Sequence, residues 1–243
     1  MQKISLRSDE RVLICGKTGS GKTFLARYVT RSLSRLVVLD GKGTLSDWNL
    51  APYDGDARRA LMQNEPIRTR VIAPLGVDNA DFWDEVLRVC FVSGNVTIYI
   101  DELYAVAPPN TRASNVLWSC YTRGRELGVG VWSSTQRPVW IPLFALSEAE
   151  HFFMFRLQLN DDRARMSEFM GADVLIPIRD LHGFYYSRAI DDNPEYNRQL
   201  EVQEDGRGKL IKVENKKSVL PIKKLPRSQI RNAALKRSLP NEP

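Results

Sequence analysis

The sequence contains few residues of the kinds that build metal centres or disulfide frameworks. Its 243 residues include three cysteines and two histidines, and no two cysteines form a CxxC pair. Zinc sites and disulfide frameworks need closely spaced or paired ligands, so both are disfavoured. We therefore expect the cysteines to be buried free thiols in a reducing cytoplasm and the histidines to be structural or surface residues rather than ligands. The residues concerned are Cys15, Cys90, Cys120, His151 and His182.

Long hydrophobic runs are also missing. No stretch of 18 apolar residues occurs, and the most apolar segment, PVWIPLFAL at 138–146, is short and interrupted by Pro142. A membrane-spanning helix needs about 20 consecutive apolar residues. The first eleven residues, MQKISLRSDER, lack the apolar centre of a signal peptide. We expect a protein of the cytoplasm with no transmembrane segment.

Positive charge is concentrated at the C-terminal end. The whole chain carries +6, but residues 205–243 hold eleven Lys/Arg and three Asp/Glu, which leaves residues 1–204 at −2. We expect a globular domain over 1–204 and a basic, weakly structured tail over 205–243. Binding of nucleic-acid phosphates, docking on a protein surface and a role in solubility alone remain open for this tail.

The order of apolar segments predicts an α/β fold. Apolar runs typical of buried strands occur at 11–16, 35–43, 68–75, 95–102, 128–136 and 150–157. Helical spacing follows Lys22 and is found again over 79–92, 111–127 and 160–171, where Asn and Asp residues suggest an N-terminal cap. Residues 181–190 suggest one arm of a late hairpin, and a polar stretch between Pro52 and Pro66 suggests no element. Such alternation predicts a mostly parallel sheet flanked by helices on both faces.

A complete phosphate-binding motif follows the first strand. Residues 16–23 read GKTGSGKT and match GxxxxGK[ST], with an apolar strand before the motif and an amphipathic helix after it. Glycines let the backbone N–H groups turn toward a phosphate, the lysine reaches the β- and γ-phosphates, and the threonine hydroxyl binds Mg²⁺. We expect ATP to be held by Gly16, Lys17, Thr18, Gly19, Ser20, Gly21, Lys22 and Thr23.

An acidic pair closes the strand VTIYIDE. We expect Asp101 to hold Mg²⁺ together with Thr23, and Glu102 to polarise the water that attacks the γ-phosphate. Alone, such a pair is also a common way to solubilise a strand end. A small-molecule kinase transfers the phosphoryl group to a substrate and has no need of this second acid. The pair therefore favours an ATPase, the P-loop NTPase fold of the RecA-like type and the cofactors ATP and Mg²⁺.

Three further motifs carry a resemblance to a known family. Asp40, Lys42 and Gly43 follow the second strand, Arg125 precedes Gly128 by three residues, and a Gln-Arg-Pro sequence starts at Gln136. In this order, and with the two motifs above, they resemble the FtsK/HerA branch of P-loop ATPases over roughly residues 10–185. The sequence departs from the family at Gly41, where proline is frequent.

The resemblance implies roles for several of these residues. Gln136 would sense the γ-phosphate, and Arg125 would be an arginine finger that enters the site of a neighbouring subunit, which implies a homo-oligomeric ring, a pentamer or hexamer. Arg123 is the competing residue for the finger. A solvated basic helix end, favoured by the helix dipole, is the alternative explanation for both arginines.

Within this branch, the chain is most similar to the genome-packaging ATPases of tailless double-jelly-roll viruses. The resemblance implies a translocase for double-stranded DNA that works at a capsid or membrane vertex. The loop 107–115 with Arg112 and the segment 42–59 are candidates for the DNA channel. The alternatives are a cellular or plasmid translocase or helicase of the same branch, a non-translocating ATP switch and a small-molecule kinase.

Overall fold

A nine-stranded sheet organises the chain in the computed structural model. The structure describes residues 4–74, 80–109, 113–180 and 182–189, and the backbone of 195–197, 199–202 and 208–211. The strands of the sheet are β1 (Arg11–Cys15), β2 (Arg35–Asp40), β3 (Ala51–Pro52), β4 (Ile67–Val71), β5 (Thr97–Asp101), β6 (Gly130–Thr135), β7 (His151–Phe155), β8 (Phe184–Arg188) and β9 (Glu195–Asn197).

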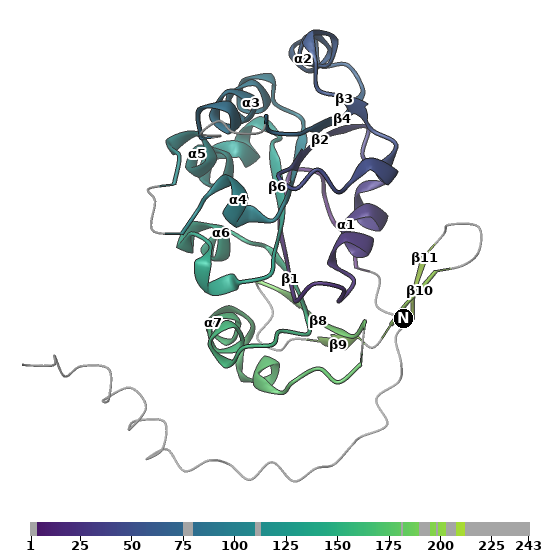
Figure 1. Ribbon diagram of the computed structural model, residues 1–243, viewed down its shortest axis with the longest axis vertical. Coiled ribbons are helices and arrows are strands. Elements are labelled where there is room, and N and C mark those ends of the chain that lie inside the picture. The colour runs from purple at the N-terminus through teal and green to yellow at the C-terminus, as the bar shows by residue number, and fades with distance from the viewer. Residues whose placement is uncertain are drawn as a thin grey trace, which may run out of the picture. The chain divides into compact units, whose positions relative to one another are not determined.

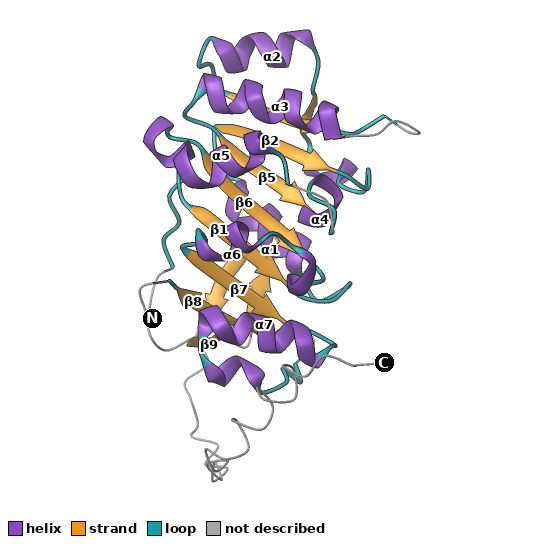
Figure 2. Ribbon diagram, turned by 90° about the vertical axis from the view of Figure 1, so that its left-hand side faces the viewer, coloured by secondary structure: helices purple, strands orange, loops and turns teal. Residues whose placement is uncertain are grey.

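The strand order is β3-β4-β2-β5-β6-β1-β7-β8-β9. The part from β2 to β9 can be followed from the top to the bottom of Figure 2. Strands β1 to β7 pair in parallel, and β8 and β9 are antiparallel additions at one side. All strands of the parallel part therefore end at the same edge, which brings the ends of β1, β5 and β6 together. The predicted mostly parallel sheet is confirmed.

Helices cover both faces of the sheet. They are α1 (Lys22–Thr30), α2 (Gly55–Met62), α3 (Ala80–Ser93), α4 (Leu103–Val106), α5 (Asn115–Arg123), α6 (Leu143–Ser147) and α7 (Asn160–Met170). Helix α1 lies on one face, and α3, α5 and α6 lie on the other (Figure 1). Four 3₁₀ turns connect elements of the described chain: η1 (Ser46–Trp48), η2 (Gly124–Leu127), η3 (Pro138–Trp140) and η4 (Ala172–Leu175).

Alternation along the strands builds one apolar core on each face. Val12 and Ile14 of β1 join Leu25 of α1 in one buried cluster, whereas Leu13 and Cys15 join the cluster under α3 and α5. Successive side chains of a strand point to opposite faces, so a strand that is apolar at every position is covered on both sides. This explains the continuous apolar runs in the sequence.

Helix α2 falls in the polar stretch where the sequence analysis expected no element. Asp54 is its N-cap, and its carboxylate accepts a hydrogen bond from the backbone N–H of Ala57 at 2.9 Å. Only Ala57 and Leu61 of its eight residues are buried. Two apolar positions make a stripe too narrow to predict a helix between Pro52, Gly55 and Pro66, which are residues typical of turns and loops.

The expected acidic cap of α7 was wrong. Leu159 occupies the N-cap position and makes no side-chain cap, so the acidic residues stand inside the first turn. Asp162 is buried and accepts hydrogen bonds from Arg137 Nε at 2.9 Å and from the backbone N–H of Val139 at 3.4 Å. Its carboxylate therefore ties α7 to the segment after β6. Gly171, with φ 88°, ends the helix as expected.

The boundary predicted between residues 204 and 205 lies outside the described residues. It falls between β10 (Gln199–Val202) and β11 (Gly208–Ile211), which pair as an antiparallel hairpin. One compact unit extends over Met1–Val213. The rest of the tail also lies outside the described residues, so the tail stays a prediction.

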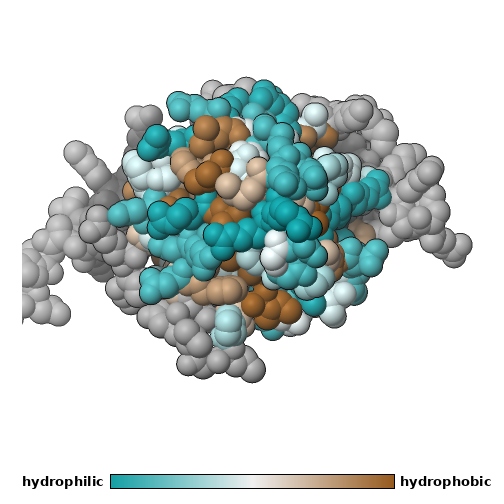
Figure 3. Space-filling model, turned by 90° about the horizontal axis from the view of Figure 1, so that it is seen from above, coloured by the Kyte–Doolittle hydropathy of each residue, from teal (hydrophilic) through white to brown (hydrophobic). Residues whose placement is uncertain are grey.

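The part of the chain that the structure describes has no helix with the length and apolarity to cross a bilayer. Figure 3 views the molecule from the side of α2, and the visible surface is mostly hydrophilic with separate small apolar patches. Cys15, Cys90 and Cys120 are buried free thiols, as expected.

Candidate nucleotide-binding site

The GKTGSGKT loop connects β1 to α1 at the carboxyl edge of the sheet. The N–H of Gly16 donates to the carbonyl of Thr135 at 3.1 Å, and the N–H of Lys17 donates to the carbonyl of Arg156 at 2.9 Å. The loop is thereby anchored to the ends of β6 and β7. Gly16 has φ 153°, and a Cβ there would lie 2.6 Å from Phe155 Cβ. The chain needs glycine at this position on both conformational and steric grounds.

Lys22 lies inside this loop. Its ammonium donates to the carbonyls of Gly16 at 2.7 Å and Lys17 at 3.1 Å, and the residue is only 8% exposed. Burial lowers the pKa of Lys22, while the carboxylates of Glu102 and Asp101 act in the opposite direction. The amine is therefore held where a polyphosphate would replace the carbonyls as its partner.

The first turn of α1 presents backbone donors to the same place. Gly21, with φ 107°, precedes the helix, and no side chain caps the turn. The first N–H groups of a helix have no partner within it and carry the positive end of its dipole. Together with Lys22 they make a site suited to a phosphate chain.

Asp101, at the end of β5, is the predicted metal ligand. The hydroxyls of Tyr99 and Ser134 donate to its Oδ1 at 3.2 and 3.1 Å, whereas Oδ2 has no hydrogen-bond partner among the described residues. Burial raises the pKa of Asp101. A divalent cation would offset the cost of this buried negative charge.

The donor set fits magnesium. Thr23, an exposed residue at the start of α1, has a hydroxyl, and Asp101 offers a carboxylate oxygen. Mg²⁺ prefers such hard oxygen ligands, usually one or two from the protein together with water and substrate phosphates. Coordination by these two residues stays a prediction.

Glu102 is buried beside Asp101 and adopts an unusual backbone conformation. It is 2% exposed and has φ 66°, in the left-handed region that side chains other than glycine seldom adopt. Its N–H donates to Ser134 Oγ at 3.2 Å. Such strain costs of order 1–3 kcal/mol and is typically found at functional sites.

A hydrogen-bonded path leads from Glu102 to the phosphate loop. The backbone N–H of Gln136, just after β6, donates to Glu102 Oε1 at 3.0 Å. The hydroxyl of Thr18 donates to the Gln136 side-chain oxygen at 2.8 Å. Gln136 therefore contacts both the loop and the acid, and its role in sensing the γ-phosphate stays a prediction.

Lys42 is the other partner of Glu102, a contact that the sequence motifs alone do not predict. Its ammonium lies 3.3 Å from Glu102 Oε2. Asp40 sets the turn that brings Lys42 there, because its buried carboxylate accepts the N–H groups of Thr44 and Leu45 at 3.1 and 2.9 Å. The Asp-x-Lys-Gly motif thus shapes a turn and delivers a cation to the buried acid.

Ser134 and Asp162 were also missed. Ser134 contacts both acids of the pair, and Asp162 holds Arg137 of the Gln-Arg-Pro motif. The signal for Ser134 is a run of three hydroxyl residues, Ser133 to Thr135, that ends a strand buried at every position. Buried hydroxyls need partners, so such a run predicts a polar cluster.

Arg125 lies at the opposite edge of the sheet. It belongs to η2, which precedes β6, whereas the loop follows β1 and lies beside the end of β6. The six residues of β6 span roughly 20 Å. Its guanidinium pairs with Glu150 Oε1 at 2.7 Å and its side chain is 51% exposed. The structure therefore does not bring Arg125 to the nucleotide site of its own chain.

Arg123 is exposed in the last turn of α5 and makes no hydrogen bond or ion pair with the described residues. It lies at the same edge as Arg125, so position alone does not separate the two. Among the candidate channel segments, residues 110–112, including Arg112, are outside the described ranges.

Comparison with known proteins finds similar chains among genome-packaging ATPases. No protein-family model matches the chain. The DNA packaging ATPase P9 of Enterobacteria phage PRD1 is 28% identical over 194 residues, which cover 73% of this chain and 82% of P9.

Solved structures give the same picture of the fold. The genome packaging NTPase B204 from Sulfolobus turreted icosahedral virus 2, in complex with ATP-gammaS, superposes with a TM-score of 0.66 at 16% identity. The match covers 79% of this chain and 98% of B204. The pCW3 conjugation coupling protein TcpA matches with a TM-score of 0.52 at 12% identity, over 76% of this chain and 59% of TcpA. The chain has the P-loop NTPase fold, and its predicted resemblance to viral genome-packaging ATPases of the FtsK/HerA branch is confirmed.

Proposed function

We propose that this chain is an ATPase that translocates double-stranded DNA and packages a viral genome. The observation that carries the proposal is the path from Thr18 through Gln136 to Glu102, next to Asp101. It joins the phosphate loop to a buried acid through one residue, whose side-chain oxygen accepts from Thr18 and whose backbone N–H donates to Glu102. ATP hydrolysis needs such an acid to orient the attacking water, and a motor must pass the presence of the γ-phosphate to other elements.

Roles for individual residues follow from their chemistry. Residues 16–23 bind the triphosphate, Thr23 and Asp101 hold Mg²⁺, Glu102 polarises water, and Gln136 senses the γ-phosphate. Mg²⁺ would neutralise phosphate charge when bound. Lys42, whose ammonium lies 3.3 Å from Glu102 Oε2, would offset the charge of the buried carboxylate.

We place the motor in a homo-oligomeric ring of five or six subunits, in the host cytoplasm or at a capsid vertex. Arg125 is too far from its own loop to stabilise charge there, so its role as a finger requires a second subunit. The relatives favour packaging over conjugation, because the match spans 98% of B204 and 59% of TcpA.

The test is ATP hydrolysis by the purified chain with and without long double-stranded DNA, alongside its mass in solution. We expect a ring-sized assembly whose turnover rises with DNA, and a Glu102→Gln control that binds ATP without turnover. An assembled protein whose turnover ignores DNA would contradict translocation. Phosphorylation of a small acceptor would instead identify a kinase.

Packaging itself is tested by nuclease protection. Empty capsids supplied with the motor, ATP and linear DNA should protect the DNA, and Glu102→Gln should abolish protection. If DNA stimulates turnover but the capsids do not protect the DNA, the protein is a translocase of the cellular or plasmid type and the packaging proposal is wrong.

A further inference from the structure

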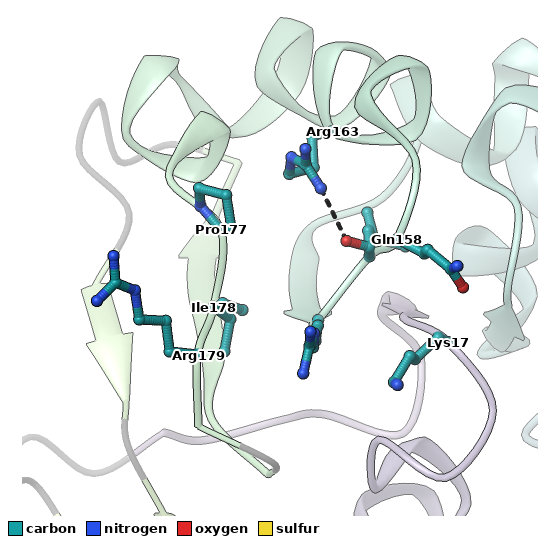
Figure 4. A pocket seen from close by; sticks show the side chains of 8 residues that line it. Lys17, Gln158, Arg163, Pro177, Ile178 and Arg179 are labelled. Carbon is teal, nitrogen blue, oxygen red and sulfur yellow. Dashed lines mark hydrogen bonds between the residues drawn. The ribbon is translucent and has the colours of Figure 1, made fainter.

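The carboxyl edge of the sheet bears a pocket whose charged residues are all basic. It has a volume of about 450 Å³ and lies beside the phosphate loop, where Lys17 forms one wall. Figure 4 shows Lys17, Arg163 and Arg179 on different sides of it. We call it the cationic pocket, and its lining residues are Lys17, Arg156, Leu157, Gln158, Arg163, Pro177, Ile178 and Arg179.

Most of this positive charge has no counter-ion among the described residues. Arg163 donates to the carbonyl of Leu157 at 2.8 Å and to the Asn160 side chain, and both acceptors are neutral. The side chains of Arg156 and Arg179 make no hydrogen bond or ion pair within the described chain. Like charges gathered in a recess repel one another, so the pocket favours an anionic partner.

The opposite edge bears carboxylates around Arg125. A second pocket, of about 530 Å³, is lined there by Arg125 together with Glu126, Glu148 and Glu150. We call these three acids the acidic collar. Glu150 accepts from Arg125, while Glu126 and Glu148 are exposed and pair with no described residue. Arg11 also lines the pocket, but it is buried and bonded to the carbonyl of Tyr121.

We infer that the acidic collar of one subunit docks on the cationic pocket of the next, and that this contact carries Arg125 to the neighbouring phosphate loop. The inference rests on the proposed function in a ring. The two surfaces lie at opposite ends of β6 and cannot meet within one chain. A second copy placed head to tail brings them together and repeats around a closed ring.

Electrostatics explains why the finger needs the collar. On its own, the guanidinium of Arg125 would approach Lys22 and the four cations of the pocket against their repulsion. Three carboxylates that move with it offset this charge, and they keep doing so when phosphate leaves and the site loses negative charge. Complementary charges of this kind also fix the register of an interface.

Exposed apolar side chains accompany both surfaces. Leu127, next to the collar in sequence, is 44% exposed, and Leu175 and Ile176, just before pocket residue Pro177, are 46% and 58% exposed. Stable interfaces combine an apolar centre with a polar rim. These side chains would supply apolar contact beside the charge pairs.

Charge reversal tests the docking directly. Arg156→Glu with Arg179→Glu makes the pocket variant, and Glu126→Lys with Glu148→Lys makes the collar variant. Each should lose the ring mass, and turnover per chain should fall by about tenfold or more. The chain with all four changes should regain both. In a ring with an even number of subunits, a mixture of the two variants should also regain both, because the two variants can alternate. Arg27→Glu with Arg88→Glu, on α1 and α3, matches the pocket variant in charge and should keep the ring.

The other outcomes overturn the inference. If the pocket variant keeps the ring but loses DNA binding, the pocket holds DNA phosphates instead. If the four-change chain stays dispersed although its melting temperature equals that of wild type, or if wild type forms no ring at any concentration, the collar does not dock there. A restored ring whose turnover ignores DNA would support the docking and contradict the proposed function.

Discussion

The two edges of the sheet treat charge in opposite ways. At the carboxyl edge, Lys22, Asp101 and Glu102 are at most 8% exposed, and each is held by neighbours from its own chain. At the amino edge, Arg125 is half-exposed and has one ion partner, Glu150. Surface ion pairs contribute little to stability, about 0–1 kcal/mol, so Arg125 is free to exchange partners. The buried charges of the loop are suited to a small ligand, whereas the exposed Arg125 is suited to contact with another molecule.

A third charged cluster near the amino edge shows what a structural group looks like. His151 lies between Glu10, at 3.0 Å, and the hydroxyl of Tyr186, at 2.9 Å, and is 1% exposed. Burial lowers the pKa of His151. Every polar atom of its ring has a partner in the chain, unlike the guanidinium of Arg123 or the carboxylate of Glu148. In its exposure, Arg125 is more like Arg123 and Glu148 than like the buried His151.

The largest effect is expected from Lys22→Ala. The ammonium is the buried cation of the loop, and without it the affinity for ATP should fall roughly 100-fold, about 2.7 kcal/mol. Binding of a fluorescent ATP analogue measures this. Lys17→Ala, which removes a lysine whose side chain lines the adjoining pocket, should cost far less. Equal losses in the two variants would show that net charge, rather than the loop geometry, binds the triphosphate.

The next largest effect is on turnover and concerns Arg125 at the amino edge of the sheet. Arg125→Ala should lower turnover by about 10³-fold or more if it acts as an arginine finger. Mixing Arg125→Ala with Lys22→Ala should restore part of the activity, because a subunit without a working loop still supplies Arg125 to its neighbour. The measurement is steady-state hydrolysis against mixing ratio.

Arg123→Ala is the matched control. It removes an arginine two positions away at the same edge and should leave turnover within a few fold of wild type. If Arg123→Ala shows the large loss and the recovery on mixing instead, then Arg123 is the finger. If neither mixture recovers, the site is complete within one chain and the contrast between the two edges fails.

Glu102→Gln should keep ATP binding and lower hydrolysis by about 10²- to 10⁴-fold, the usual contribution of a general base. The amide can still accept the Gln136 N–H, so the fold around it is preserved. A single-turnover experiment separates chemistry from binding. Glu126→Gln, the same change at the amino edge, should leave single-turnover chemistry within a preassembled ring nearly unchanged. Normal turnover by Glu102→Gln would assign water activation to another group.

The difference between the edges also explains what the sequence could predict. The loop, Asp101 and Glu102 are local motifs at strand ends, and parallel strands deliver their ends to one edge, so their meeting follows from pattern alone. The contacts of Lys42, Ser134 and Asp162 depend on a turn and on neighbouring strands far apart in sequence. No local period encodes them.

Helix α2 and the first turn of α7 show the limits of local signals within the fold. A helix with two buried residues leaves a weak stripe, and the Asn-Asp-Asp run of residues 160–162 matches a cap whose position is taken by Leu159. At the amino edge the limit is of another kind. The partners of Glu126 and Glu148 belong to another molecule in our inference, so the sequence of one chain and its fold contain only half of the contact.

The smallest effect tests how much the buried Asp101 carboxylate at the carboxyl edge destabilises the folded protein. Because burial raises the pKa of Asp101, the folded chain holds its proton more tightly than the unfolded chain. Its favourable contribution is therefore present below the unfolded pKa and is lost as the pH rises through the folded pKa. At neutral pH the ionised group costs stability, and Asp101→Asn should raise the melting temperature of the magnesium-free protein by about 2–4 °C for each 1 kcal/mol removed. The asparagine oxygen still accepts from Tyr99 and Ser134.

The gain should shrink as the pH falls below the folded-state pKa, where the aspartic acid is already neutral. Melting curves from pH 4 to 8 without magnesium measure it, and Asp47→Asn, an exposed carboxylate, is the control that should shift by less than about 1 °C. Magnesium with nucleotide should stabilise wild type more than Asp101→Asn, because binding the ion offsets the free-energy cost of the buried carboxylate charge, which the asparagine lacks. If the variant melts lower than wild type at pH 8, the neighbours of Asp101 stabilise its ionised carboxylate. The buried charge would then not destabilise the metal-free protein, and magnesium would have no such cost to offset.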